Sequence, residues 1–142
     1  MTDPKGYFLE DLSVGMSSNY SKTVTDADIL KFAEVSGDTN PLHLDDAFAK
    51  TTRFKERIAH GMLSAGFIST ILGTQLPGPG SIYMSQSLRF KAPVRIGDTV
   101  TARAEIIDIR ADKKRVTLAT TCTVGDEVVI EGEALVMVPS RI

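Results

Sequence analysis

The chain has little of what a secreted, metal-binding or nucleic-acid-binding protein needs. Its 142 residues include one cysteine and two histidines, and the formal net charge is −2. A single cysteine cannot form an internal disulfide, which favours a reducing compartment such as the cytoplasm. The slightly acidic balance argues against nucleic acid as the main partner, because phosphate binding normally needs a basic field. With no HxxxH spacing and no cysteine cluster, we expect no metal site.

The chain also lacks a hydrophobic run long enough to cross a membrane. The stretch 61–88 has no charged residue, but its apolar part ends at Leu76, before Pro-Gly-Pro-Gly. A membrane helix needs roughly 20 predominantly apolar residues, so the stretch predicts a buried helix and no membrane contact. The polar N-terminus is unlike a signal or transit peptide. No glycine-rich phosphate loop follows a predicted strand, so we expect no nucleotide or other cofactor.

The pattern of apolar residues predicts one α+β domain over residues 1–142. A capping box at 25–28 begins a helix that ends at Gly37, a short helix begins at Asp45, and an apolar helix covers about 60–76. Alternating residues predict strands at 81–91, 98–110, 115–124 and 127–138, and more weakly at 17–24. Short turns favour an antiparallel meander, with a bulge near 106–107 where the alternation breaks.

The predicted sheet has to cover the apolar helix. A helix that is apolar on all sides is a core helix, and wrapping the sheet around it buries both most simply. Each of the four stronger strands is expected to turn one apolar face to this core; this face holds Ile82, Met84, Leu88 and Phe90 in the first, and Val128, Ile130, Ala134, Val136 and Val138 in the last. A single sheet leaves open edges, and pairing of two chains removes them. We therefore expect a homodimer.

Asp38 and His43 lie in a segment that cannot be one continuous helix. Pro41 lacks an N–H and disfavours the α region for Asn40, and Gly37 allows a positive φ just before the acid. The result is a shaped loop that aims a carboxylate and an imidazole five residues apart. Either residue alone is often structural, since Asp favours turns. Together they point to general acid–base chemistry on a water molecule.

Residues 32–43 resemble a known catalytic motif. Their sequence, FAEVSGDTNPLH, with Ala49 six residues on, resembles the hydratase 2 motif of the MaoC-like, (R)-specific enoyl-CoA hydratases. Two weaker stretches, HGM at 60–62 and GSIYMSQSLRF at 80–90, resemble the same family, particularly short bacterial enzymes that feed polyhydroxyalkanoate synthesis. The resemblance covers about residues 8 to 139. It implies a hot-dog fold and the hydration of trans-2-enoyl-CoA to (R)-3-hydroxyacyl-CoA.

The resemblance also implies roles for individual residues. Asp38 and His43 would hold the catalytic water; we favour Asp38 as the base and His43 as the group that orients the water and shares its proton. Gly61, at the positive end of the apolar helix, would offer its N–H to the thioester oxygen, although tight packing explains a glycine there equally well. Asn40 would hold the loop in place without touching the substrate.

Further positions carry weaker predictions. By resemblance, Ser69 would lie near the catalytic pair, while Leu72 and Val136 would line the acyl pocket. A serine bonded back to its own helix and two ordinary core residues account for the same positions. The phosphates of coenzyme A should meet basic groups, and the candidates are Arg53, Lys55, Arg57, Arg89, Lys91 and Arg95.

Three other functions stay open at this stage. A 3-hydroxyacyl-carrier-protein dehydratase runs the same chemistry in reverse on another carrier. A hot-dog acyl-CoA thioesterase also uses a carboxylate near the start of the central helix, but here Asp38 and His43 precede that helix, which fits hydration better. A non-catalytic acyl-CoA-binding module is disfavoured by the intact acid–histidine pair.

Overall fold

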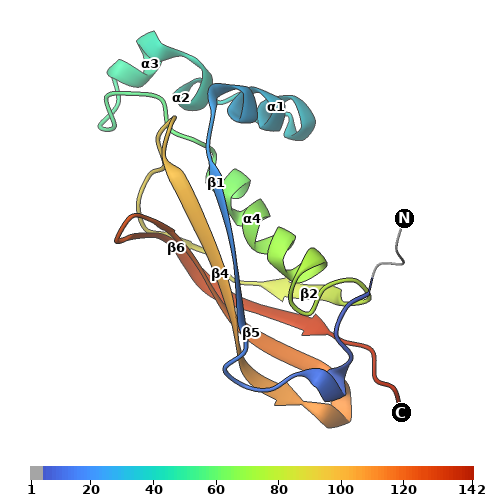
Figure 1. The fold of residues 1–142 in the computed structure, drawn as a ribbon. Helices are drawn as coiled ribbons and strands as arrows, with labels where there is room; N and C mark the ends of the chain where they lie inside the picture. The colour runs from blue at the N-terminus through green and yellow to red at the C-terminus, as the bar shows by residue number, and fades with distance from the viewer. Residues whose placement is uncertain (1–4) are drawn as a thin grey trace.

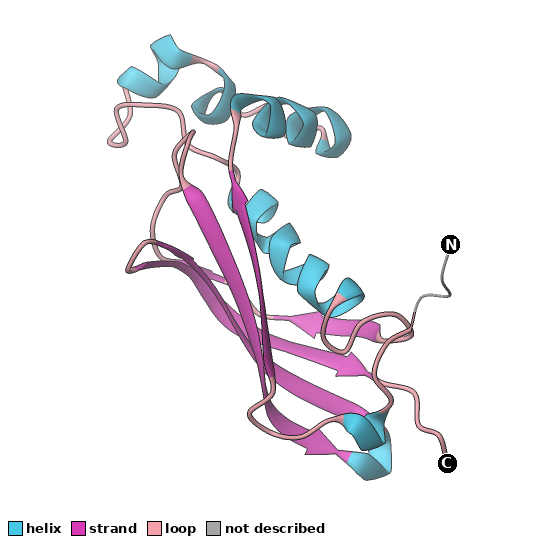
Figure 2. Ribbon diagram, viewed as in Figure 1, coloured by secondary structure: helices cyan, strands magenta, loops and turns pink. Residues whose placement is uncertain are grey.

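One long helix, α4 (Gly61–Thr74), lies across one face of a six-stranded antiparallel sheet (Figure 2). The computed structural model describes residues 5–142. The strands are β1 (Ser17–Thr23), β2 (Ile82–Gln86), β3 (Arg89–Phe90), β4 (Thr99–Arg110), β5 (Arg115–Val124) and β6 (Glu127–Met137). Their order is β1-β4-β5-β6-β2, and β3 also pairs with β6. This is the α+β, hot-dog arrangement that the sequence predicted.

The remaining helices are short, and most gather at one end of the molecule. They are η1 (Leu9–Asp11), α1 (Asp26–Ser36), α2 (Pro41–Leu44), α3 (Asp46–Lys50) and η2 (Ala111–Lys113). Figure 1 shows α1, α2 and α3 together beyond the N-terminal end of α4. The predicted capping box begins α1: Asp28 N donates to Thr25 Oγ1 at 3.1 Å, and Thr25 N donates to the Asp28 carboxylate at 3.0 Å. Gly37 ends that helix with φ at 79°.

The core lies between α4 and the sheet. On α4 the buried apolar side chains include Phe67, Ile68, Ile71 and Leu72. Full burial of such a side chain contributes about 1.5–3 kcal/mol. The helix is not covered on all sides, however, which corrects one expectation. A stripe of Met62, Gly66, Ser69 and Gly73 is exposed, because the sheet reaches only one side of the helix.

Two bulges set which strand residues face the core. The predicted bulge in β4 is confirmed: the register with β5 shifts between Ile106 and Asp108, and Ile107 turns outward. A second shift lies between Cys122 and Thr123, opposite β6. It makes the expectation for Val128 wrong, because the bulge reverses the alternation and buries Val129 instead.

The predicted strand 81–91 differs most from the structure. It forms two strands, β2 and β3, and β2 pairs with β6 rather than with β4, so the sheet is not a simple meander. The apolar face predicted to point inward is largely exposed: Ile82 is 59%, Met84 40% and Phe90 54% accessible. Within residues 5–142, no helix has the length and hydropathy to cross a membrane.

Candidate active site

The loop before α2 fixes Asp38 and Asn40 through side-chain to backbone bonds. Asp38 Oδ1 accepts from Asn40 N at 3.2 Å, and Asn40 Oδ1 accepts from Leu42 N at 3.0 Å. Asn40 therefore caps a one-turn helix that the sequence analysis treated as irregular. Pro41 is compatible with that turn because the first helical N–H has no intrahelical acceptor. The cap orients the helix that carries His43.

His43 is buried, and both its ring and its backbone carbonyl are hydrogen-bonded. Its Nδ1 lies 2.8 Å from the Ile58 carbonyl oxygen, and its own carbonyl accepts from Arg57 Nε at 2.7 Å. Because a carbonyl can only accept, Nδ1 carries the proton and the neutral ring keeps its lone pair on Nε2. Burial lowers the pKa of His43, an effect that the Ile58 hydrogen bond partly opposes. The imidazole is thus disposed to be a neutral hydrogen-bond acceptor.

His60, the first residue of the HGM stretch, belongs to the same cluster. Its Nε2 lies 3.0 Å from the Asp38 carbonyl oxygen, and its ring stacks on that of His43 with centroids 3.9 Å apart. It packs on Phe32 as well, at 4.7 Å. His60 therefore holds the Asp38 loop in place from the start of α4. The sequence feature that could have indicated this role is the position of His60 directly before Gly61, in a chain with two histidines.

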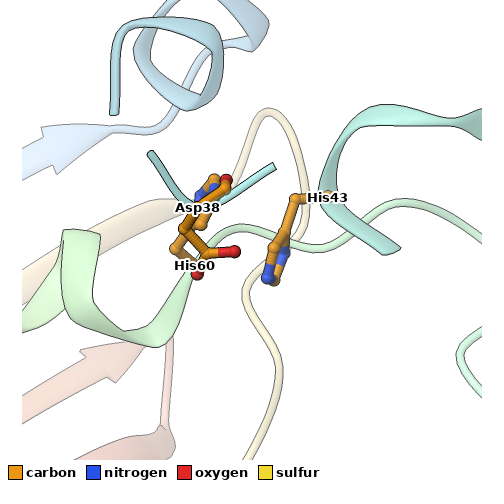
Figure 3. Close-up of side chains that lie close together, drawn as sticks. All are labelled: Asp38, His43 and His60. Atoms are coloured by element: carbon orange, nitrogen blue, oxygen red, sulfur yellow. The ribbon is translucent and has the colours of Figure 1, made fainter. Parts of the chain in front are cut away.

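Figure 3 shows the three side chains converging from separate segments. One ring nitrogen of each histidine and a carboxylate oxygen of Asp38 all lie within 4.8 Å of one another. Two hydrogen bonds of about 2.8 Å span such a gap, so one water molecule can bridge the acid and an imidazole. The cluster suits a metal ion less well. Rings stacked at 28° project their in-plane lone pairs side by side rather than toward one point.

Gly61 begins α4 beside this cluster. Its N–H is the first of the helix and has no intrahelical acceptor. The ring of Phe90 lies directly on it: a Cβ added at Gly61 would come within 2.5 Å of Phe90 Cε1. Gly61 thus permits a close approach at the positive end of the helix. Phe90 is a contact that the sequence analysis did not assign to the site.

Two cavities open around Gly61 and share four lining residues: His43, His60, Gly61 and Phe90. One cavity, of about 240 Å³, is also lined by Asp38 and Met62. The other, which we call the apolar cavity, has a volume of about 230 Å³ and extends from Ser64 at α4 to Val129 and Ile130 at β6. The Phe90 ring borders both, so the acid–base cluster and the apolar cavity meet at the first turn of α4.

Three of the predicted site residues lie elsewhere in the chain. Ser69 is exposed, eight residues beyond Gly61 and about 12 Å along the helix axis. Leu72 and Val136 are fully buried in the core, and neither lines these two cavities. Within the described chain, therefore, the structure does not bring Ser69, Leu72 or Val136 to Asp38 and His43. Instead Ser64, a buried serine that the sequence did not single out, lines the apolar cavity together with His43 and His60.

Some of the basic candidates form ion pairs and others line the apolar cavity; Lys91 does both, since its Nζ lies 3.6 Å from Glu131 Oε1. Arg57 bonds to Asp26 at 2.6 Å and to the His43 carbonyl, which gives it a structural role. Arg95 pairs with Glu56. Arg53 and Lys91 line the apolar cavity, where the Arg53 guanidinium stacks over Phe54. These two cations are the ones placed to meet an anionic group at its mouth.

The fold and site together define a class of protein: a hot-dog domain whose carboxylate and imidazole lie beside the free N-terminus of its central helix. A family model described as "MaoC like domain" matches residues 13–128. The chain therefore belongs to the MaoC-like domain family.

Similar proteins agree with this placement. An (R)-specific enoyl-CoA hydratase of Rhodospirillum rubrum is 60% identical, covering 95% of this chain and 94% of the relative. A 3-hydroxybutyryl-CoA dehydratase of Methylorubrum extorquens is 52% identical, over 94% and 85% of the two chains. The solved (R)-hydratase of Aeromonas caviae, titled as involved in PHA biosynthesis, superimposes with a TM-score of 0.89 at 49% identity, over 92% and 99% of the chains.

Proposed function

We propose that this chain is an (R)-specific enoyl-CoA hydratase, a hydro-lyase that adds water to trans-2-enoyl-CoA to give (R)-3-hydroxyacyl-CoA. The observation that supports it best is the Asp38–His43 pair beside the start of α4. A carboxylate oxygen of Asp38 and a ring nitrogen from each of His43 and His60 lie within 4.8 Å of one another. The family and the named activities of relatives that match nearly the whole chain support the same reaction.

In the proposed mechanism, Asp38 and His43 hold the water between them. Neutral His43 can accept from the water through Nε2, since Nδ1 is committed to Ile58. Asp38 takes a proton as the water oxygen bonds to Cβ and the C=C electron pair moves toward the thioester oxygen. The pair then returns a proton to Cα, so that H and OH are added and the enzyme is unchanged. General acid–base catalysis of this kind contributes about 10²–10⁴-fold.

Charge that develops on the thioester oxygen needs a hydrogen-bond donor, and we assign this role to the Gly61 N–H. The first N–H groups of a helix lie at its positive end and have no partner within it. An absent side chain at Gly61 lets the thioester approach that N–H once the Phe90 ring turns aside; Phe90 is 54% exposed and has room to do so.

The substrate is an acyl-CoA thioester, and two cations suit its phosphates. Arg53 and Lys91 line the apolar cavity near its solvent side, while Val129 and Ile130 line it more deeply. Charge-assisted bonds from such cations to phosphate are stronger than neutral ones. We therefore assign the coenzyme end to Arg53 and Lys91.

A homodimer accounts for the apolar surface left open in one chain. The stripe of α4 and the apolar face of β2 described above are both open to solvent. Among the described strands, β2 pairs only with β6 and is therefore an edge strand. An apolar edge strand is a strong template for pairing with another chain. A dimer through these surfaces would bury Ser69, and would give that residue a place near the acyl group that one chain does not provide.

We assign the reaction to the cytoplasm. Cys122 is buried, and its burial raises the pKa of the thiol to about 12, so the side chain stays protonated and unreactive. A free thiol without a disulfide partner fits a reducing compartment.

A direct test is to incubate the purified protein with crotonyl-CoA while recording both enoyl absorbance and free thiol. Loss of the enoyl band without release of thiol, with (R)-3-hydroxybutyryl-CoA as the product by chiral analysis, is the expected result. Release of thiol would identify a thioesterase instead. Binding without any turnover across enoyl chain lengths would identify a non-catalytic module.

A further inference from the structure

Ser64 carries a buried hydroxyl that the fold leaves without a partner. The residue is 1% exposed, and its Oγ has no hydrogen-bond partner in the part of the chain that the structure describes. Buried polar atoms are normally satisfied, so such an atom in a native fold needs an explanation. Ser64 also lines the apolar cavity, with Gly61, His43 and His60. The unpaired hydroxyl is therefore at the site and not elsewhere in the core.

The two threonine hydroxyls of α4 behave differently from that of Ser64. Thr70 Oγ1 donates to the Gly66 carbonyl at 3.1 Å, and Thr74 Oγ1 donates to the Thr70 carbonyl at 2.6 Å. Both are the usual bond from a helical Ser or Thr to the carbonyl four residues earlier. Ser64 does not make the corresponding bond to the His60 carbonyl, which accepts from Leu63 N at 3.1 Å. Its hydroxyl is thus left free where α4 borders the cavity.

Helix geometry directs this hydroxyl toward Gly61. Residues three apart lie on the same side of a helix, about 5–6 Å apart at Cβ. Every Cα–Cβ bond tilts toward the N-terminus, so a side chain covers the turn before its own Cα. For Ser64 that turn is the first of α4, where the Gly61 N–H has no acceptor. One oxygen atom placed at this turn can accept from both groups.

We propose that the Ser64 hydroxyl is a second hydrogen-bond donor to the thioester oxygen of the substrate, beside the Gly61 N–H. This inference rests on the proposed hydratase function. Attack of water at Cβ moves the electron pair of the double bond toward that oxygen, and a donor aimed at the developing charge acts mainly in the transition state. Ser64 would then be a catalytic residue whose unpaired state in the free protein is preorganisation for this bond.

The test compares Ser64→Ala with Thr74→Val, which removes a hydroxyl of the same helix that already has a partner. We expect Ser64→Ala to lower kcat for crotonyl-CoA by about 10²-fold, with a smaller change in KM. Its Tm should be no lower than that of the wild type, because no bond within the protein is lost. Thr74→Val should keep wild-type kinetics. Ser64→Cys, which keeps a weak donor, should fall between Ser64→Ala and the wild type.

A binding measurement separates this role from packing. Butyryl-CoA carries the thioester oxygen, and S-butyl-CoA, its thioether analogue, lacks it. Ser64→Ala should weaken binding of butyryl-CoA several-fold and leave that of S-butyl-CoA unchanged. Wild-type kcat in Ser64→Ala would overturn the proposal, as would equal weakening of both ligands together with a lower Tm. A wild-type protein that does not hydrate crotonyl-CoA contradicts the proposed function, whereas the two-ligand comparison still reports on the Ser64 bond.

Discussion

His43 and His60 hold each other's segments in place. Their rings stack with centroids 3.9 Å apart and 28° between the planes. His43 donates to the carbonyl of Ile58, two residues before His60, and His60 donates to the carbonyl of Asp38, five residues before His43. The two hydrogen bonds cross between the loop of 38–43 and the segment before α4. They tie the acid–base pair to the helix whose N-terminus is proposed to hold the thioester.

This relationship predicts that His60 positions Asp38. His60→Phe keeps an aromatic ring for the stack but removes the N–H that bonds to the Asp38 carbonyl. A misplacement of about 1 Å at a reacting group can cost about 10²-fold in rate, so we expect kcat to fall by about 10–100-fold. Steady-state kinetics with crotonyl-CoA measure it, with Tm as the control for folding. Unchanged kcat would show that Asp38 is held by its own loop alone.

Substitutions at Asp38 and His43 should lower activity far more than they lower stability. Asp38→Asn and His43→Gln are each expected to lower kcat by at least about 10²–10⁴-fold. Asp38 is exposed, and its carboxylate bonds only to Asn40 N within the loop, so circular dichroism and Tm should stay near wild type for Asp38→Asn. His43→Gln also removes the Ile58 bond and is expected to lower Tm somewhat. A folded Asp38→Asn protein with near-wild-type turnover would rule out the mechanism.

The state of His43 predicts the acid side of the pH profile. Burial and the neighbouring His60 lower its pKa below the ordinary value of 6.5, while the Ile58 bond and the Asp38 charge raise it in part. Protonated His43 has no lone pair to accept from water, so activity should be lost as pH falls through this lowered pKa. We expect the acid limb of kcat/KM to have its midpoint below 6.5.

A proton NMR titration of the His43 ring gives an independent reading. Since the Asp38 charge raises the pKa of His43, Asp38→Asn should lower that pKa further. A midpoint above 6.5, or a His43 pKa that rises in Asp38→Asn, would contradict the neutral acceptor role.

Dimerisation should depend on β2. Met84 is 40% exposed on β2, and a lysine there would place a charge on the surface proposed to meet the second chain. We expect Met84→Lys to shift the protein from dimer to monomer in analytical ultracentrifugation, and to lower activity if the partner helps to form the acyl site. Ile107→Lys is the matched control, because Ile107 is 41% exposed at the β4 bulge, away from β2 and α4. A wild-type protein that sediments as a monomer would exclude the dimer.

Local patterns were sufficient for much of the fold and for half of the site. The capping box of α1, the αL cap at Gly37 and the β4 bulge depend on residues a few positions apart, and all three form as the sequence indicated. The loop that presents Asp38 and His43 is equally local, since Asn40 and Pro41 shape it directly. Such features can be predicted from the sequence because the residues that cause them lie within a few positions of one another.

The tertiary structure decided what depends on distant segments. The partner of β2, the open stripe on α4 and the position of Ser69 follow from how far the sheet extends around the helix. The role of His60 comes from bonds to residues about twenty positions away, and the unpaired Ser64 hydroxyl is visible only against the cavity it borders. The sequence alone therefore determined the residues of the proposed acid–base pair. Packing determined which donors are left free for the proposed bond to the thioester oxygen, because hydrogen-bond satisfaction is a property of the whole fold.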